Sequence, residues 1–372
     1  MKILSRSFLG KSTSIAYPHG NSFTADGESV VVCRTADESG RPPQLLIRNL
    51  QTSEIRALPP IPTDAAAVQP NTTICFDVAH AAPRLVATYR ADLWTLHLRR
   101  GATWRHVFAQ PEGVKIQDLP AISPDGRRCL IGLDDASSHG VVEVDLESTQ
   151  TRTLFVKKWH ANHFHYSPHD PSWIGFAHEG PAEQITDRCW VWHPTHAPEG
   201  RVVFNQFKVS DDPAKPLAVG HERWTFHDVS AYVVAYAVSP STKRGLYEMF
   251  ADGREPRLLR ETNTAWHCNV DASGRFAVID TSAAWDAVPA RGPEFENGVA
   301  RHRQADREKL PNLSDIVLFD LRTGEHLCVA RATRTKHPFH PHPALSADAR
   351  WLVFSDATPG NTGSWLIELD LS

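Results

Sequence analysis

The chain has 372 residues, of which 41% are hydrophobic and 22% charged, an ordinary composition for a globular protein. This composition excludes a disordered chain, a collagen-like repeat and a coiled coil. The formal net charge of −4 gives no long-range attraction to nucleic acid or to an anionic membrane. For the same reason, we expect any acidic ligand to be held by a local cluster of side chains. The unusual count is 20 histidines.

The first residues of the chain form a short apolar run that Ser5, Arg6 and Ser7 interrupt, so the run is too polar for the core of a signal peptide. No stretch of about 18 apolar residues occurs that would predict a membrane-spanning helix. The cysteines form no Cys-x-x-Cys pair and are spread along the chain, at Cys33, Cys75, Cys129, Cys189, Cys268 and Cys328. We expect a cytoplasmic protein with reduced thiols and with no nucleic-acid, membrane or obligatory protein partner.

One local pattern recurs along the chain. A turn of the Ser-Pro-Asp-Gly type is followed by a short apolar run, a polar break and an alternating strand that often ends in Asp-Leu. In the clearest copy, the turn at Ile122–Gly126 leads into Cys129–Gly132, and Val141–Leu146 follows. The other clear copies begin at Phe23, Val270 and Leu345, and weaker copies begin near Phe76, Tyr166 and Phe226. The chain therefore contains seven similar units.

Seven units in 372 residues are about 53 residues each, close to the length of one propeller blade with inserts. Each unit reads as a four-stranded antiparallel sheet that buries both faces only by packing against its neighbours. The sequence predicts a single-domain, all-β protein over residues 1–372, a seven-bladed β-propeller with four-stranded blades around a central channel. Two β-sandwich domains are the alternative. Only residues 301–309, in an insert at 285–312, have a helical pattern, and this insert is a candidate cover for the channel.

The sharpest cluster of histidines is the segment His337-Pro-Phe-His340-Pro-His342-Pro. Its prolines force an extended course, so His340 and His342 project to the same side and form a chelating pair. The segment precedes the first strand of the last unit, which faces the predicted channel. His267, at the same point of the preceding unit, is a candidate for a further ligand. The alternative is that these are solvated loop histidines.

Two further groups combine histidine with charged side chains. His178 and Glu179 are followed by Asp187-Arg188, and His221 lies in Gly220-His-Glu-Arg-Trp224. A single histidine at a strand end is more often a packing residue than a base. Next to a metal and the fixed positive charge of Arg188, however, these groups indicate a site for a carboxylated ligand.

In order and spacing, these elements resemble the oligogalacturonate lyases, a family of manganese-dependent seven-bladed propellers that cleave short uronate chains by β-elimination. The resemblance covers residues 160–372. It rests on four elements: His178-Glu-Gly-Pro181 with Arg188 ten residues after His178, Gly220-His-Glu-Arg-Trp224, His267, and His340-Pro-His342-Pro343.

The resemblance implies a role for each matched residue. His267, His340 and His342 match metal ligands, and His337 stands where the family has a glutamine ligand. The site would then have four imidazoles, a set that suits Zn²⁺, Ni²⁺ or Fe²⁺ as well as the Mn²⁺ of the family. His221 matches the catalytic base and Arg188 the arginine that binds substrate. His163 and His178 match other histidines of the family's cleft.

The resemblance also implies the activity, a metal-dependent lyase that acts on acidic, uronic-acid-containing oligosaccharides in pectin degradation. Its product would be an unsaturated uronate, formed after the C5 proton is removed. The main alternative is a non-catalytic propeller that serves as a binding module. A metal-dependent hydrolase is a further alternative, but the candidate ligand set lacks the carboxylate that such sites usually contain.

Overall fold

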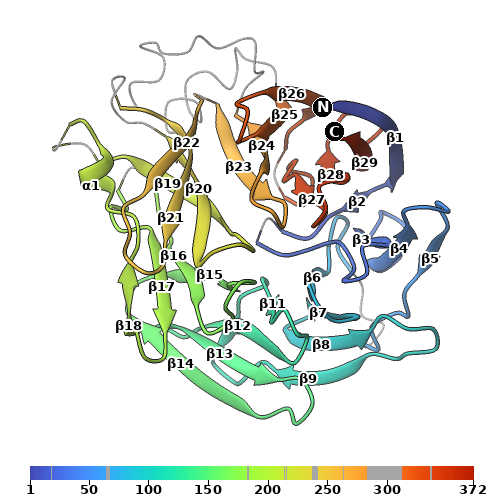
Figure 1. Cartoon of the computed structure of the whole chain (residues 1–372). Helices are drawn as coiled ribbons and strands as arrows, with labels where there is room; N and C mark the ends of the chain where they lie inside the picture. Colours follow the sequence, from blue (N-terminus) through green and yellow to red (C-terminus); the bar gives the residue numbers. More distant parts are fainter. Residues whose placement is uncertain are drawn as a thin grey trace.

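Seven antiparallel β-sheets are arranged in a ring in the computed structural model of the chain (Figure 1). The structure describes residues 1–372 except 18, 64–67, 182–183, 213, 215, 237–241, 263, 283–311 and 336. The predicted seven-bladed β-propeller is confirmed. The alternative of two β-sandwich domains is wrong, because the sheets follow one another around one ring.

The first four blades follow chain order from the axis outward. Blade 1 contains β2 (Thr13–Ser14), β3 (Ser29–Arg34), β4 (Gln44–Asn49) and β5 (Ile55–Ala57). Blade 2 contains β6 (Cys75–Val78), β7 (Arg84–Tyr89), β8 (Asp92–His97) and β9 (Arg105–Ala109). Blade 3 contains β10 (Lys115–Ile116), β11 (Ala121–Ile122), β12 (Arg128–Asp134), β13 (His139–Asp145) and β14 (Thr151–Lys157), with β10 and β11 both paired to β12. Blade 4 contains β15 (Ala161–Tyr166), β16 (Ile174–His178), β17 (Cys189–His193) and β18 (Ala197–Val202).

The last three blades use the remaining strands and the first strand of the chain. Blade 5 contains β19 (Ala218–Trp224), β20 (Ser230–Tyr236), β21 (Gly245–Phe250) and β22 (Arg257–Glu261). Blade 6 contains β23 (Ala265–Val270), β24 (Phe276–Thr281), β25 (Leu313–Asp320) and β26 (His326–Thr333). Blade 7 contains β27 (Ala344–Leu345), β28 (Trp351–Asp356), β29 (Gly363–Asp370) and β1 (Lys2–Lys11).

The recurring turn joins the first and second strands of a blade. In blade 3, the Ser123 hydroxyl donates to Asp125 at 2.6 Å and accepts the Arg128 amide at 2.9 Å. The same pair of bonds forms around Thr24 in blade 1 and Ser346 in blade 7. The hydroxyl and the carboxylate thus close each turn locally, which explains why the motif recurs along the sequence.

The core consists of the layers between neighbouring blades. Between blades 3 and 4, Leu130 and Val141 form one buried cluster with Phe164, Ile174 and Phe176, all at most 3% exposed. Each sheet buries both of its faces only because it has a neighbour on each side. The same requirement holds for the first and the last blade, so the ring must close.

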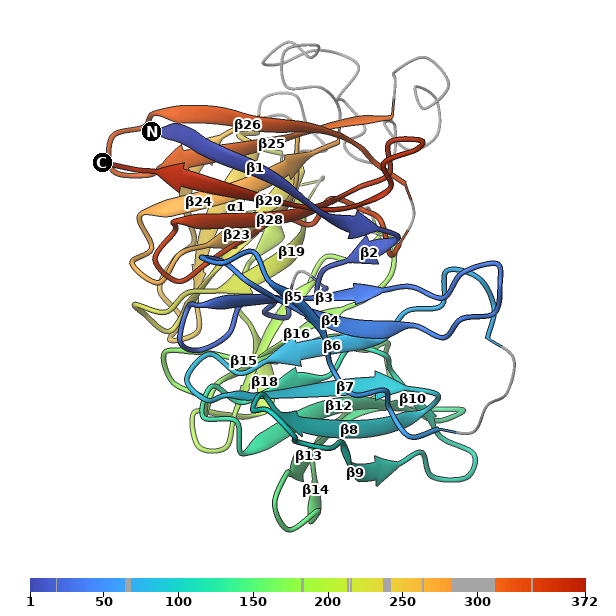
Figure 2. The same cartoon turned by 90° about the vertical axis from the view of Figure 1, so that its right-hand side faces the viewer.

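The ring closes through strands from opposite ends of the sequence. In blade 7, β1 pairs antiparallel with β29, from Lys2 opposite Asp370 to Lys11 opposite Gly363 (Figure 2). Leu9 of β1 is 3% exposed and shares a buried cluster with Leu50 of blade 1 and Trp351 of blade 7. This strand therefore completes the last sheet and seals the layer between blades 7 and 1.

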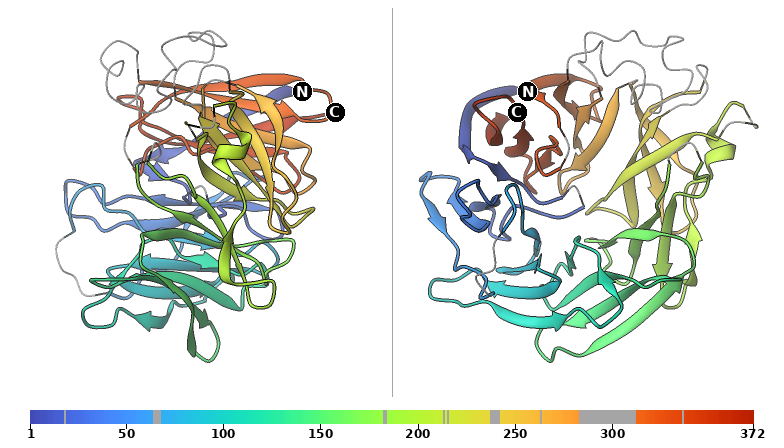
Figure 3. Two further views of the ribbon diagram at one scale, coloured as in Figure 1. Left: turned by 90° about the vertical axis from the view of Figure 1, so that its left-hand side faces the viewer. Right: turned by 180° about the vertical axis from the view of Figure 1, so that it is seen from behind.

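After β2 the chain leaves the sheet and runs to the middle of the ring, as the blue trace shows in Figures 1 and 3. We call residues 15–17 and 19–21 the central segment. Asn21 donates to Asp77 at 2.7 Å and to the Val78 carbonyl at 3.0 Å, both in blade 2. On the opposite side, Arg223 of blade 5 donates to the Gly20 carbonyl at 3.1 Å. The segment is thus fixed at the axis by blades that lie far apart in the sequence.

Helix is scarce among the described residues. The four-residue α1 (Gln206–Val209) is capped by the side chain of Asn205. Across the described parts of the chain, no helix is long and apolar enough to cross a membrane. The predicted helical pattern at 301–309 and most of the 285–312 insert lie outside the described residues.

Because Leu9 seals the ring, we expect Leu9→Ala to lower the free energy of unfolding by about 2–5 kcal/mol. Leu4 lies on the same strand but is 55% exposed. We expect Leu4→Ala to change that free energy by at most about 0.5 kcal/mol. Urea unfolding followed by tryptophan fluorescence measures both values. Equal losses in the two variants would contradict the role of β1 in closure.

Candidate metal centre and active-site cleft

Three of the candidate histidines have a left-handed backbone conformation next to the axis. The φ angles are 59° at His163 in β15, 58° at His221 in β19 and 44° at His342 before β27. In both strands the histidine lies at a break in register, between Asn162 and His165 and between Gly220 and Arg223. Such a conformation costs about 1–3 kcal/mol for a residue with a side chain, and it is concentrated at functional sites. The bulges re-aim these imidazoles relative to a regular strand.

His267, His340 and His342 converge at one point of the channel. One ring nitrogen of each lies within 4.8 Å of the other two. The ring centroids are 4.2 Å apart for His267 and His342 and 4.8 Å apart for His340 and His342. Among the described residues, Nε2 of His342 is buried and has no hydrogen-bond partner. Burial lowers the pKa of His342 well below its ordinary value. Three converging imidazoles, one of them with an unsatisfied buried nitrogen, fit a transition-metal ion.

Asp280 of β24 supports this triad, although the sequence analysis did not select it. Both of its carboxylate oxygens accept from Nδ1 of His267, at 2.8 and 2.9 Å, so the lone pair of His267 lies on Nε2. The same carboxylate accepts the His342 amide at 3.1 Å. Burial opposes the charge on Asp280, but hydrogen bonds and charges from the histidines outweigh it and lower its pKa. One carboxylate thus orients the ligand histidine and joins the two segments of the triad.

Asp280 could have been found from the hairpin that the sequence already indicated. The turn at 271–274 pairs Val270 with Ala277, and continuing the same pairing places His267 opposite Asp280. A carboxylate opposite a candidate ligand histidine is the usual arrangement in a metal site.

His337 lies at the edge of the triad. Its ring centroid is 4.7 Å from that of His342 and 6.0 Å from that of His340. The structure thus brings three of the four predicted ligands together, and the fourth stands beside them. His337 as a ligand stays a prediction.

His221, the predicted base, lies next to the triad. Its ring centroid is 4.1 Å from that of His267. Burial, followed by the influence of His267 and Arg188, lowers the pKa of His221 well below its ordinary value. The imidazole is therefore neutral at neutral pH, the form that accepts a proton.

Arg188 and His163 meet at one carboxylate. The guanidinium of Arg188 donates to Oε1 of Glu179 at 2.5 Å, and Nδ1 of His163 lies 3.2 Å from the same oxygen. Burial lowers the pKa of His163 to about 4, against the opposing charge of Glu179. Glu179 therefore fixes the position of the arginine beside the neutral imidazole.

His178, in contrast, forms a separate contact with Asp187. Its Nδ1 lies 2.7 Å from Oδ1 of Asp187. Its ring stacks on Trp159 with the centroids 4.3 Å apart. The structure thus places His178 on a different carboxylate from the one that holds Arg188.

Tyr17 of the central segment connects the triad with the group around Arg188. Its ring centroid is 5.2 Å from that of His342 and 5.5 Å from that of His163. The Tyr17 hydroxyl lies 3.4 Å from Nε2 of His163. No pattern in the sequence singles out this residue, because its position depends on the path of the central segment and not on a strand.

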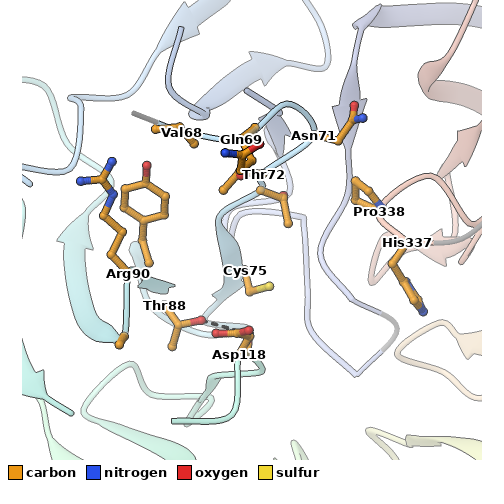
Figure 4. A pocket seen from close by; sticks show the side chains of 13 residues that line it. Val68, Gln69, Asn71, Thr72, Cys75, Thr88, Arg90, Asp118, His337 and Pro338 are labelled. Atoms are coloured by element: carbon orange, nitrogen blue, oxygen red, sulfur yellow. Dashed lines mark hydrogen bonds between the residues drawn. The ribbon is translucent and has the colours of Figure 1, made fainter. Parts of the chain in front are cut away.

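A pocket of about 750 Å³ opens beside His337 (Figure 4). The other lining residues come from the segment between blades 1 and 2, from blade 2 and from Asp118 before β11, and include Gln69, Asn71, Thr72 and Arg90. A pocket of this size next to His337 has room for a ligand larger than one sugar ring.

The comparisons with known proteins bear on the fold and on the family that the chain resembles. No family model matches the chain. The oligogalacturonate lyase of Dickeya dadantii is 22% identical over 237 residues, which are 62% of this chain and 55% of that protein. The match thus spans about half the length of the curated relative.

Two solved structures share the fold over nearly the whole chain. An oligogalacturonate lyase in complex with manganese is 17% identical with a TM-score of 0.72, over 97% of this chain and 91% of that one. The oligogalacturonate lyase of Vibrio parahaemolyticus is 14% identical with a TM-score of 0.77, over 98% and 94%. The chain is thus a seven-bladed propeller with a histidine cluster at its axis. The resemblance to the oligogalacturonate lyases that the motifs indicated is confirmed.

Because Asp280 orients His267, we expect Asp280→Asn to weaken divalent metal binding by about 10- to 100-fold. Isothermal titration calorimetry with Mn²⁺ and with Zn²⁺ measures the affinity. Asp320→Asn is the matched control, since Asp320 is a buried carboxylate of the same blade that pairs with Arg275. Equal affinity in the wild type and in Asp280→Asn would contradict the supporting role.

Proposed function

We propose that this protein is a metal-dependent lyase that cleaves uronic-acid oligosaccharides, oligogalacturonate in particular, by β-elimination. The observation that carries the proposal is the convergence of His267, His340 and His342 with a neutral His221 beside them. The relatives named oligogalacturonate lyase and the manganese-bound structure support the choice of substrate and reaction.

In this proposal His267, His340 and His342 hold a divalent ion, with His337 as a fourth ligand. The ion is Mn²⁺ by resemblance, while an all-imidazole set favours Zn²⁺, Ni²⁺ or Fe²⁺ over Mn²⁺. When bound, the ion acts as a Lewis acid that stabilises the negative charge developing on the uronate carboxylate. Asp280 keeps the ligand nitrogen of His267 directed at the ion.

His221 is the base that removes the C5 proton of the uronate. A general base must be deprotonated at neutral pH and must lie beside the bound carboxylate. The neutral imidazole of His221, next to the triad, meets both requirements. The electron pair of the C5–H bond forms the C4–C5 double bond, and the bond from C4 to the glycosidic oxygen breaks. The leaving oxygen takes a proton from water, and an unsaturated uronate is released.

Arg188 binds and orients the substrate. Its guanidinium is held by Glu179 and so keeps a fixed direction in the cleft. His163 lies at the same carboxylate and faces Tyr17, so this group forms one wall of the cleft. The pocket beside His337, with Gln69, Asn71 and Arg90 in its lining, accommodates further sugar units of the substrate. His178 stays a proposed substrate contact.

The direct test is incubation of the metal-loaded protein with short oligogalacturonates. A growing ultraviolet absorbance from the unsaturated uronate is the expected result, and chelation of the metal abolishes it. Other uronate oligosaccharides, tested in parallel, rank the substrates. Bound metal with no product from any of these oligosaccharides would refute the lyase activity. Binding of an oligosaccharide without cleavage would support a binding module instead.

Because His221 is the proposed base, we expect His221→Ala to lower kcat by at least about 100-fold while one equivalent of metal stays bound. His227→Ala is the control, since His227 lies in the following turn and contacts Glu248. Turnover from the absorbance assay and metal content from mass spectrometry are measured on the same samples. Retained turnover in His221→Ala would contradict the assignment of His221 as the base.

A further inference from the structure

A second cluster of metal-type side chains lies in the channel, formed by His19, His165 and Glu222. These residues come from the central segment, from β15 and from β19, so three separate parts of the fold bring them together. One ligand atom of each lies within 4.8 Å of the other two. The rings of His19 and His165 are stacked, with centroids 5.0 Å apart and an angle of 9° between the planes.

The nitrogen and oxygen atoms of this cluster that could bind a metal are buried and make no hydrogen bond within the described part of the chain. Among the described residues, both nitrogens of His19, Nε2 of His165 and both carboxylate oxygens of Glu222 make no hydrogen bond. Leaving a buried carboxylate and two buried imidazoles unsatisfied is unfavourable, because these groups lose their hydration and gain no hydrogen bond in exchange. Burial raises the pKa of Glu222 to about 7, although Arg188 opposes the shift.

The tautomer of His165 is set by the backbone. Its Nδ1 lies 2.6 Å from the carbonyl oxygen of His163, and a carbonyl only accepts, so Nδ1 carries the proton. The lone pair of His165 is therefore on Nε2, the atom that has no partner among the described residues. This pattern, with one nitrogen bonded to a backbone carbonyl and the other left open, is typical of a metal ligand.

The backbone around the cluster is held in place. Arg223 donates to the carbonyl oxygens of His19 and Gly20. On the other side of the segment, Asp77 accepts the Asn21 amide at 2.7 Å and the Ile122 amide at 2.9 Å. The cluster is thus preorganised before any ligand binds.

We propose that His19, His165 and Glu222 bind a second divalent metal ion, Zn²⁺ by ligand type, separate from the site of His267, His340 and His342. Two imidazoles and one carboxylate form a known zinc set that leaves one position for water. The ion neutralises the charge of Glu222 and links the central segment to blades 4 and 5.

Another group of similar composition in the described chain lacks these features. Asp134, His139 and His160 also place ligand atoms within 4.8 Å of one another. Nδ1 of His139, however, is already bonded to Asp134 at 2.7 Å, and His160 is exposed. The cluster of His19, His165 and Glu222 therefore differs in that its potential metal-binding atoms are buried and make no hydrogen bond to any described residue.

The test is the number of metal ions per chain. The purified full chain is loaded with ZnCl₂, desalted and analysed by mass spectrometry. We expect two ions in the wild type, one in Glu222→Gln, one in the double variant His340→Ala/His342→Ala, and none when all three changes are combined. Glu248→Gln is the matched control, because Glu248 is a buried carboxylate that is bonded to Ser230 and Arg257, and this variant keeps two ions.

One ion in the wild type, with none left in the double variant, overturns the proposal, as does an unchanged count in Glu222→Gln. If Glu222→Gln does not fold, His19→Asn in the central segment tests the same site. Thermal unfolding gives a second measure, since Zn²⁺ should raise the Tm of the double variant but not of the combined variant. Lyase activity is not used in this test, so its outcome is independent of the proposed function.

Discussion

The pairing of β1 with β29 is the interaction on which the rest of the structure depends. A four-stranded sheet with two apolar faces is stable only between two neighbours, and a ring provides these only when it is closed. With the ring closed, the innermost strands of all seven blades face one axis. The rings of His221, His267 and His342 then lie side by side, with neighbouring centroids 4.1 and 4.2 Å apart. Tyr17 contacts both His163 of blade 4 and His342, although 179 residues separate these two histidines.

Most of the fold could be predicted from the sequence because its repeating unit is stabilised locally. The hydroxyl of Ser123 and the carboxylate of Asp125 close their turn through bonds that span only a few residues, and the same chemistry recurs in other blades. The role of β1 could not be predicted in this way. Its partner lies at the other end of the chain, and no local pattern records a pairing over such a distance.

The residues of the candidate site also differ in whether a local sequence pattern reveals them. His340 and His342 are readable because prolines fix the local backbone, and Asp280 follows from the register of one hairpin. Tyr17 and His19 are not readable, since they become part of the site only where the central segment reaches the axis. The position of His337 at the edge of the triad is also a property of the assembled channel, which spacing in the sequence does not determine.

The path of the central segment has a consequence for the order of folding. The segment follows β1 and the short strand β2, and β1 has its place in the ring only after β29 exists to receive it. During synthesis the early blades can stack as they emerge, and the central segment can then bond to Asp77 and Val78 of blade 2, but its bond from Arg223 has to wait for blade 5. Contacts between such distant parts of a chain form slowly. Because His340 and His342 follow blade 6 in the sequence, a partly synthesised chain that reaches only blade 6 does not present the complete histidine cluster.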